Sequence, residues 1–432
     1  MFPPTTIGTP APGSMIGAWA RDPKGSLQLS GAEPALSAEE QDVQRRVHEF
    51  AAEVMRPVGR RLDRMSPEEV IAAGSPLWDV YRGFAGLGLG VDRFLELEPQ
   101  PMARMMCLVF EELGWGDAGL AISLGASMLP RLTAAKFGNR FLLERTAPSL
   151  IGCWGAAEPR HGSDVVDANG HLFDPRGDYG RPDCVATIGA DGVVINGRKA
   201  EWVSNGSIAQ VCILQCVADT GNGPDVRQGC FVVVPLDAAG VSRGDPLDKI
   251  GQRSLNQGGL IFDNVELPLD YVLAGPEDYL RACYSTLSDG NAIMAVTFTG
   301  AARAAFELAL GFAHERRQGG VPIIRHQNVA YRLFHMYRKV EAARALSRRA
   351  LVYNYTQPEP AMHVAMAAKI TSTQNSFEVA SDAVQIFGAR GLTAQYPIEK
   401  IFRDTRASLI EDGCNEVLAI KGGSYLIDDR AG

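Results

Sequence analysis

The sequence predicts an α+β multidomain protein of 432 residues, in which an N-terminal α-helical domain, a middle antiparallel β-barrel or sandwich and a C-terminal four-helix bundle follow one another. Two observations support this order. Short β-branched runs separated by turn residues occupy the middle of the chain, with no helical pattern between them. Apolar residues at helical spacing occupy both flanks. We therefore expect an extended arm over residues 1–34, helices over 35–151, the β domain over 152–272 and the bundle over 273–432.

The N-terminal flank is expected to open with a helix at Ser37, because Ser37 and Glu40 have the spacing of a capping box. The face of this helix that turns inward is expected to hold Val43, Val47, Phe50, Ala51 and Val54. Helical patterns then continue to about residue 150, with breaks near residues 74–76, across 83–90 and near 98–101, where Gly and Pro gather.

The residue pattern of the middle region predicts β-strands. Residues 184–188 and 193–196 are β-branched runs on either side of a Gly-Ala-Asp-Gly turn. Further runs follow at 211–214, 231–234 and 260–262. Strands at this spacing, without helices between them, are typical of a small antiparallel barrel or sandwich.

The helical period returns after Pro268 and holds to the end of the chain. One seam repeats at alternating spacings of four and three residues, through Val329, Leu333, Met336, Val340 and Ala343. A second segment, residues 361–387, is rich in Ala and unbroken. Several long helices are therefore expected to pack together as a bundle.

Composition excludes several classes of protein. The net charge is −8, with acidic and basic residues mixed along the chain, whereas a nucleic-acid-binding protein would show a basic stripe. No run reaches 18 apolar residues, so we expect no membrane span. None of the eight cysteines forms a C-x-x-C pair, and the seven histidines lack metal-binding spacings. We expect no metal site, and reduced thiols in a cytoplasmic protein.

Two adjacent carboxylates, Glu411 and Asp412, stand immediately before Gly413 at a break between two helical patterns. A carboxylate shielded by packed helices gains basicity and can take a proton from a weakly acidic carbon. By itself, however, Asp412-Gly413 is also a common helix stop, and Asp412 could simply cap the next helix.

No nucleotide-binding fingerprint is present, because the nearest glycine-rich run, residues 86–90, has the wrong spacing and no preceding strand. Six other segments, taken in chain order, form a more specific set: Glu158-Pro159-x-x-Gly162-Ser163-Asp164, Trp202-Val203-Ser204-Asn205-Gly206, Gly251-Gln252-Arg253, Glu315-Arg316-Arg317 with His326-Gln327, Gln385-Ile386-Phe387-Gly388-Ala389-Arg390-Gly391, and Tyr396-Pro397-Ile398-Glu399-Lys400 with Arg403-Asp404. With the Asp412 segment, this set resembles the acyl-CoA dehydrogenase family of flavoproteins over roughly residues 35–428.

The resemblance implies FAD, bound between the β domain and the C-terminal bundle with a second subunit contributing. It implies that the flavin and its neighbourhood are contacted by Trp154, Ala157, Ser163, Trp202, Val203, Ser204, Cys414 and Glu416. It implies that the adenosine and phosphate half is contacted, partly across a dimer interface, by Arg316, Gln318, His326, Gln327, Gln385 and Ala389. Substrate contacts would come from Ser163, Ser288, Asn291 and Gly413.

The activity that the resemblance implies is α,β-dehydrogenation of an acyl-CoA thioester in fatty acid metabolism. Asp412 would take the α-proton, with Glu411 as the rival base, and FAD would accept the β-hydrogen as hydride. An electron-transfer flavoprotein would reoxidise the flavin, and the enzyme would be a homodimer or homotetramer, with neither nucleic acid nor membrane as a partner.

Several positions depart from the family pattern. Asp412 stands where the family usually has Glu, Glu411 where Tyr is frequent, and Asn291 where Arg is frequent. Cys414 and Glu416 replace the usual Thr and Gln. Two alternatives therefore remain open: a flavin oxidase of the same fold that acts on a small carbon acid such as a nitroalkane, and a non-catalytic flavoprotein.

Overall fold

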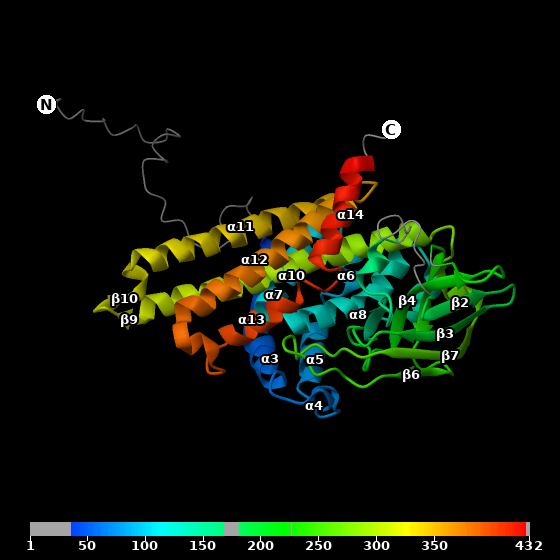
Figure 1. The fold of residues 1–432 in the computed structure, drawn as a ribbon, viewed down its shortest axis with the longest axis horizontal. Helices are drawn as coiled ribbons and strands as arrows, with labels where there is room; N and C mark the ends of the chain where they lie inside the picture. Colours follow the sequence, from blue (N-terminus) through cyan, green and yellow to red (C-terminus); the bar gives the residue numbers. More distant parts are fainter. Residues whose placement is uncertain (1–35, 168–180, 226, 429–432) are drawn as a thin grey trace. The chain divides into compact units, whose positions relative to one another are not determined.

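The computed structural model describes residues 36–167, 181–225 and 227–428 (Figure 1). The predicted arm over residues 1–34 lies outside this range. The chain divides into two compact units, residues 1–41 and 42–432. In the described part of the first unit, Ser37 and Glu40 form the predicted capping box: each backbone N–H donates to the other residue's side chain, at 2.8 and 3.1 Å.

The helices that precede the sheet follow the hydrophobic pattern of the sequence. They are α2 (Ala38–Phe50), the π-turn η2 (Ala51–Met55), α3 (Arg56–Leu62), α4 (Pro67–Ile71), α5 (Leu77–Leu87), α6 (Val91–Leu95), α7 (Pro99–Gly116), α8 (Ala118–Lys136) and α9 (Arg140–Arg145). The predicted face of α2 and η2 is confirmed, since Val43, Val47, Phe50 and Ala51 are buried. The predicted break across residues 83–90 is wrong at its start, because α5 runs through Gly83 and ends at Leu87. Gly83 serves packing instead: a Cβ there would lie 2.7 Å from the Phe50 ring.

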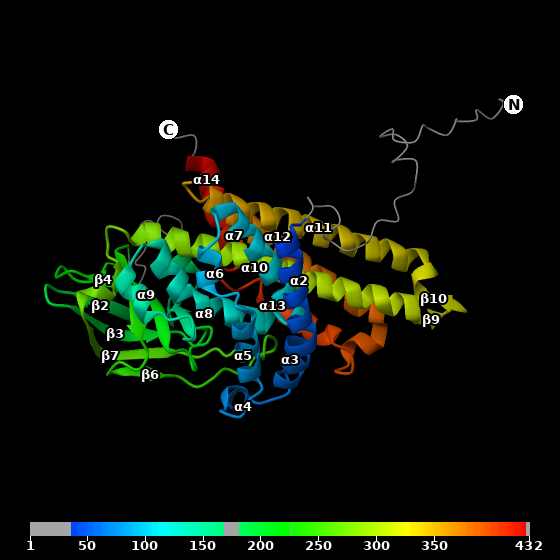
Figure 2. The same ribbon diagram turned by 180° about the vertical axis from the view of Figure 1, so that it is seen from behind.

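The middle of the chain forms one sheet, in the order β6-β7-β3-β2-β4-β5-β8, with β1 also paired to β4. Its strands are β1 (Gly152–Gly155), β2 (Cys184–Ile188), β3 (Val193–Lys199), β4 (Val211–Asp219), β5 (Gly229–Pro235), β6 (Val241–Arg243), β7 (Leu260–Leu267) and β8 (Val272–Ala274). Most neighbours are antiparallel, as predicted, whereas β1 and β2 run parallel to β4. Helix α8 packs on β1 and β4, and Figure 2 shows it beside the sheet.

The C-terminal region is helical, as predicted. It contains α10 (Tyr279–Glu315), α11 (Gln327–Thr356), α12 (Met362–Phe387), α13 (Ile398–Ala407) and α14 (Asn415–Asp428), with a short β9–β10 hairpin (Arg317–Gln318 and Val321–Pro322) after α10. Leu333, Met336, Val340 and Ala343 of the predicted seam are buried, and Val329 is half-buried.

Helix α10 forms the centre of this region and packs against α7, α11 and α12. By length and composition it could cross a membrane, but 78% of its most apolar window is buried within the protein, as in a core helix. The helix contains no long uninterrupted apolar run, because polar residues such as Asp289, Asn291 and Arg303 lie within it.

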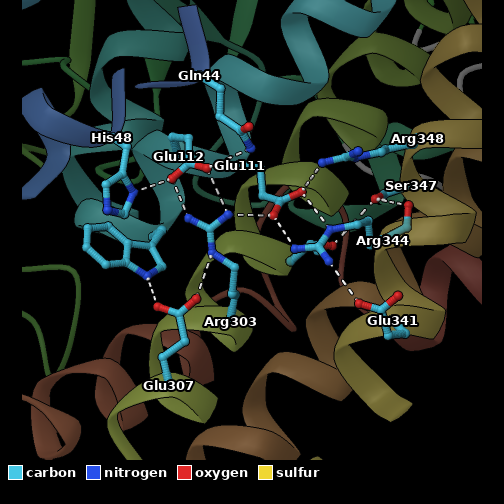
Figure 3. A network of polar contacts seen from close by, with 12 residues as sticks. Gln44, His48, Glu111, Glu112, Arg303, Glu307, Glu341, Arg344, Ser347 and Arg348 are labelled. Atoms are coloured by element: carbon cyan, nitrogen blue, oxygen red, sulfur yellow. Dashed lines mark hydrogen bonds and ion pairs between the residues drawn. The ribbon is translucent and has the colours of Figure 1, made fainter. Parts of the chain in front are cut away.

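A buried network of charges fastens α7 to α10 and α11 (Figure 3). Glu111 accepts from Arg303 at 2.9 Å, from Arg344 at 2.5 Å and from Arg348 at 2.8 Å. Glu112 also pairs with Arg303, at 2.9 Å from its Oε1. Because each carboxylate meets at least one guanidinium, the cluster can stay charged in a dry environment.

Candidate active site

The turn between α13 and α14 holds Glu411, Asp412 and Gly413. Asp412 has φ +50° and Gly413 has φ +90°, so two consecutive residues lie in the left-handed region. A Cβ at Gly413 would lie 2.9 Å from side-chain atoms of both Leu418 and Val166, so only glycine fits there. Asp412 does not occupy the N-cap position, because α14 begins three residues later, at Asn415. The helix-cap interpretation of Asp412 is therefore not supported.

The Asp412 carboxylate lies against α10. A Cβ on Gly290 would be 3.4 Å from Oδ2 of Asp412 and 3.9 Å from the Trp154 ring. The carboxylate and the indole therefore both lie close to this glycine. The carboxylate makes no hydrogen bond or ion pair with any residue in the three described ranges. Burial raises the pKa of Asp412, and the charge of Lys369 opposes this. The group is thus a carboxylate with enhanced basicity and free lone pairs.

Two predicted residues from other elements form hydrogen bonds with this turn. The Asn291 amide donates to the Asp412 carbonyl at 3.2 Å, and the Ser163 hydroxyl accepts from the Cys414 N–H at 3.0 Å. Several buried polar atoms here have no partner among the described residues: Trp154 Nε1, Ser288 Oγ and Asn291 Oδ1. Buried polar groups are normally satisfied, so these atoms indicate a site built for a bound molecule.

Glu411 is the second carboxylate of the turn. Its Oε2 accepts from the Gln252 amide at 3.0 Å, and the Gln252 N–H donates to Asp404 Oδ1 at 2.5 Å. Burial raises the pKa of Glu411 to about 7, with the Asp412 charge adding to the rise and the Gln252 hydrogen bond opposing it. Glu411 is therefore held by the loop before β7, whereas Asp412 has no such restraint.

The loop that follows β3 exposes an aromatic ring on a fixed backbone. Trp202 is 62% exposed, although tryptophan in a β domain is usually core. Its carbonyl accepts from Gln257 at 3.1 Å, and Ser204 pairs with Gln257 in an isolated bridge. Asn205 anchors the loop through its amide to the Ser123 and Gly152 carbonyls, at 2.8 and 3.0 Å. A rigidly held, exposed indole is suited to stacking on a planar ligand. Val203 packs its side chain into the sheet core, so only its backbone could face such a ligand.

Comparisons with known proteins decide the family. The model of the acyl-CoA dehydrogenase C-terminal domain matches residues 280–422, and that of the middle domain matches residues 153–265, together more than half of the chain. This chain belongs to the acyl-CoA dehydrogenase family. It is an oxidoreductase that acts on CH–CH groups, and its cofactor is FAD. The family predicted from the motifs, the fold class and the cofactor are thereby confirmed.

The relatives span almost the whole chain at low identity. A probable acyl-CoA dehydrogenase of Bacillus subtilis, YngJ, is 27% identical over 88% of this chain and 96% of its own length. The short-chain-specific enzyme of Megasphaera elsdenii is 29% identical over 74% of this chain and 81% of its own. Among solved structures, butyryl-CoA dehydrogenase of Megasphaera elsdenii superposes with a TM-score of 0.78, at 23% identity, covering 91% of this chain and all of that one. A glutaryl-CoA dehydrogenase bound to glutaryl-CoA gives 0.77, at 25% identity, covering 90% and 95%.

The residues predicted for FAD fall into two separate groups in this acyl-CoA dehydrogenase. Trp154, Ser163 and Cys414 lie at the Asp412 turn, near the start of α10, with Glu416 exposed on the first turn of α14. Ala157 leads from β1 into the loop of Ser163, where its carbonyl accepts from the Ala200 N–H at 2.9 Å. The exposed Trp202 ring and the unpartnered Trp154 N–H fit a planar, polar-edged group such as isoalloxazine.

The second group lies at the other end of α10, around the β9–β10 hairpin (Figure 1). It comprises Arg316, Gln318, His326 and Gln327, with Gln385 and Ala389 at the adjacent end of α12, where Phe312 stacks on Phe387 at 4.1 Å. From Gly290 to Glu315 the helix rises roughly 38 Å at 1.5 Å per residue. The two groups of a single chain are therefore far apart along α10.

Two residues of the site were missed by sequence reasoning. Gln252 lies within one of the six motifs, but the motif predicts no role for it, and Lys369 lies in none of the motifs. Lys369 Nζ donates to the Gly413 carbonyl at 2.8 Å and to Asn415 Oδ1 at 2.9 Å. A lysine within the Ala-rich run 361–387 is the signal that could have drawn attention to it. Among the described residues, no cluster of metal-binding side chains is present.

Proposed function

We propose that this enzyme catalyses α,β-dehydrogenation of an acyl-CoA thioester, with Asp412 as the catalytic base. The observation that supports this most is the Asp412 carboxylate, which lies beside Gly290 and Trp154 without a hydrogen-bond partner among the described residues and whose pKa is raised by burial. A base with these properties can take the α-proton of a thioester near neutral pH. FAD, when bound, supplies the acceptor for the β-hydrogen as hydride.

The α-carbon becomes acidic enough only if the thioester carbonyl is polarised. The backbone N–H of Asp412 donates to no residue of the described chain, and it adjoins the base itself. It is therefore available to the carbonyl oxygen, in the manner of an oxyanion hole. Asn291 and Ser163 hold the peptide groups on either side of Gly413, directly after Asp412.

The partners belong to the same proposal. An electron-transfer flavoprotein is the proposed electron acceptor, which is consistent with a structural neighbour from work on the electron-transferring flavoprotein of Acidaminococcus fermentans, at a TM-score of 0.78. A homodimer or homotetramer is supported by the two separated groups of cofactor residues, since a neighbour's Arg316 group could complete the site of the first chain. A place in fatty acid metabolism and a cytoplasmic location are proposed with it; the free state of all eight cysteines supports the latter.

The test is anaerobic mixing of the FAD-loaded enzyme with thioesters from butyryl-CoA to palmitoyl-CoA and with glutaryl-CoA. We expect bleaching of the oxidised flavin band with at least one of them, together with a 2-enoyl-CoA product two hydrogens lighter. The same panel defines the acyl group that the enzyme prefers. Bleaching by a nitroalkane alone would instead support the oxidase alternative. No bleaching by any carbon acid would support a non-catalytic flavoprotein.

A further inference from the structure

Lys369 is a fully buried lysine that lies beneath the catalytic turn. It sits on α12, with none of its surface exposed. Other buried lysines have carboxylate partners: Lys199 pairs with Glu158 at 2.6 Å, and Lys400 pairs with Asp117 and Asp404 at 2.6 Å. Lys369 forms no ion pair with a residue of the described chain; its acceptors are a carbonyl and an amide oxygen. A buried ammonium without a carboxylate partner costs free energy, so its presence calls for a compensating role.

The turn is clamped at the two peptide groups that flank Gly413, by side chains from three different elements. Asn291 of α10 donates to the Asp412 carbonyl at 3.2 Å. Lys369 of α12 donates to the Gly413 carbonyl at 2.8 Å. The Ser163 hydroxyl of η3 (Ser163–Val166) accepts from the Cys414 N–H at 3.0 Å. This arrangement fixes the left-handed conformation of the turn and therefore the direction of the Asp412 side chain.

Helix α12 also holds the turn at a second point, one helical turn beyond Lys369. The Asn415 side chain accepts from Lys369 Nζ at 2.9 Å, and its own amide donates to the Thr373 hydroxyl at 3.0 Å. Lys369 and Thr373 are four residues apart and share a face of α12. The start of α14 is thereby fixed to the same helix face as Gly413.

The charges that face this site come from several elements. The turn and the start of α14 contribute the carboxylates of Glu411, Asp412 and Glu416, whose charges interact with that of Lys369. The loop before β7 contributes Lys249, which interacts with Glu411, and beyond it lie Asp404 and Lys400. Helix α10 contributes Gly290 and Asn291, which are uncharged. Lys369 is thus the cation that acts on Asp412 itself, against the effect of burial.

The ammonium of Lys369 keeps its proton at neutral pH despite its surroundings. Burial lowers the pKa of Lys369 to about 8, and the charges of Asp412 and Glu411 oppose this fall. The lysine is therefore mostly protonated at neutral pH and can act on the nearby carboxylates as a cation.

We propose that Lys369 is the positioning residue of the catalytic turn: it clamps the Gly413 carbonyl and supplies the positive charge that keeps the Asp412 carboxylate ionised in a dry site. This inference rests on the proposed role of Asp412 as the base. It assigns to α12 a function that neither the motifs nor the family matches assign.

The experiment separates the charge of Lys369 from its hydrogen bond. Lys369→Met removes both, Lys369→Gln retains a donor without the charge, and Lys369→Arg retains the charge. Asn415→Ala removes one acceptor of Lys369 and leaves its charge unchanged. Each FAD-loaded variant is titrated in two ways: by the pH dependence of flavin reduction with the best thioester, and by the infrared band of the protonated Asp412 carboxyl, assigned by its loss in Asp412→Asn. The infrared measurement needs no turnover.

We expect Lys369→Met and Lys369→Gln to raise the apparent pKa of the base by about one unit or more, which lowers the rate below that pKa by about tenfold. The rate should recover at higher pH, and the protonated band should persist to higher pH. Lys369→Arg and Asn415→Ala should keep the wild-type pKa, with the rate slowed by less than about tenfold. Unchanged titrations in both neutral variants would overturn the proposal, as would a loss of rate that no pH restores at normal FAD content.

Failure of the proposed function would look different. If Asp412→Asn still reduced flavin, Asp412 would not be the base, yet the infrared titration of Asp412 in Lys369→Gln would still report on the electrostatic role of Lys369. If Lys369→Met does not fold, Lys369→Gln and Lys369→Arg carry the comparison alone.

Discussion

Two regions of this protein hold a pair of adjacent acidic residues, buried at Glu111 and Glu112 and half-buried at Glu411 and Asp412, and the two pairs have different neighbours. Burial opposes the ionisation of Glu112, but Arg303 and His48 lower its pKa to about 2, and Glu111 pairs with three arginines (Figure 3). At Glu411 and Asp412, burial raises the pKa of both residues, and no arginine meets either carboxylate among the described residues. Acidic residues thus form ion pairs between helices in one region and a proton acceptor in the other.

The difference lies in what the neighbouring helices present. Helices α10 and α11 turn Arg303, Arg344 and Arg348 toward the first pair. Toward the second pair, α10 presents Gly290 and Asn291, and α12 presents Lys369, which binds backbone and amide oxygens rather than a carboxylate. Full pairing favours stability, whereas incomplete pairing retains proton affinity near neutral pH, as general base catalysis requires.

The largest effect is expected from Asp412→Asn, which keeps the shape of the base and removes its basicity. Flavin reduction by the best thioester should slow by roughly 100- to 10,000-fold, the usual contribution of a positioned base. FAD should remain bound, because the change alters no hydrogen bond of the side chain to a described residue. Stopped-flow absorbance of the FAD-loaded variant measures the rate, and the absorbance ratio of flavin to protein measures the cofactor content. A rate within tenfold of wild type would move the base elsewhere.

The next effect concerns the first pair and should appear in stability rather than in rate. Arg303→Met leaves Glu111 and Glu112 buried with fewer partners, so the free energy of unfolding should fall by about 3–5 kcal/mol. Flavin reduction per bound FAD should stay within about twofold of wild type. Denaturant unfolding of the FAD-loaded protein provides the measurement.

A matched surface variant provides the control for that prediction. Arg45 pairs with Asp42 and Glu49 but is 57% exposed, so Arg45→Met should lower the free energy of unfolding far less than Arg303→Met does. Equal losses for the two arginines would remove the distinction between the buried network and an ordinary surface pair. Loss of flavin reduction in folded Arg303→Met would show that the network also serves the chemistry.

Much of the fold could be predicted from the sequence, because local patterns determine where helices and strands form. The capping box at Ser37, the buried seam of α11 and the run of strands follow from spacing alone. The break expected across residues 83–90 was wrong at its start, because a glycine that admits the Phe50 ring looks the same in sequence as a glycine that ends a helix. Such a distinction depends on a contact with a distant segment.

The residues of the candidate site also divide into those that local motifs predict and those whose roles depend on distant contacts. Asp412, Ser163 and Asn291 could be found through motifs, and the structure brings them together. The roles of Gln252, although it lies in a motif, and of Lys369 could not be predicted, since each acts by a hydrogen bond to the turn over a separation of 159 and 44 residues, respectively. Nor could the sequence show that the Arg316 group lies far along α10 from Asp412, because that distance is set by the unbroken length of the helix.

The smallest effect is expected from Glu411→Gln, and it tests whether the second pair is really two distinct groups. Glu411 has a pKa of about 7, raised from its ordinary value by burial first and by the Asp412 charge in addition. Its ionisation should therefore contribute a second inflection near pH 7 to the rate profile of flavin reduction. In Glu411→Gln this inflection should disappear while the rate stays within about tenfold of wild type. If Glu411→Gln were inactive and Asp412→Asn active, the two roles would be exchanged.

The free energy of unfolding of Glu411→Gln provides an independent test. The sign of its expected change with pH follows from the raised pKa of Glu411. A carboxyl whose pKa is higher in the folded than in the unfolded state favours folding below its unfolded pKa, and this contribution is lost as the pH rises through the folded value. For Glu411 the window runs from its ordinary pKa of 4.5 to about 7. Wild type and Glu411→Gln should thus differ least near pH 4.5, and above pH 7 the variant should be the more stable by roughly 1–3 kcal/mol, since it buries no charge. Denaturant unfolding at the two pH values measures the difference. A difference in the free energy of unfolding that stays constant across this window would mean that Glu411 is ionised throughout. The pair Glu411 and Asp412 would then resemble Glu111 and Glu112, although no arginine of the described residues pairs with it.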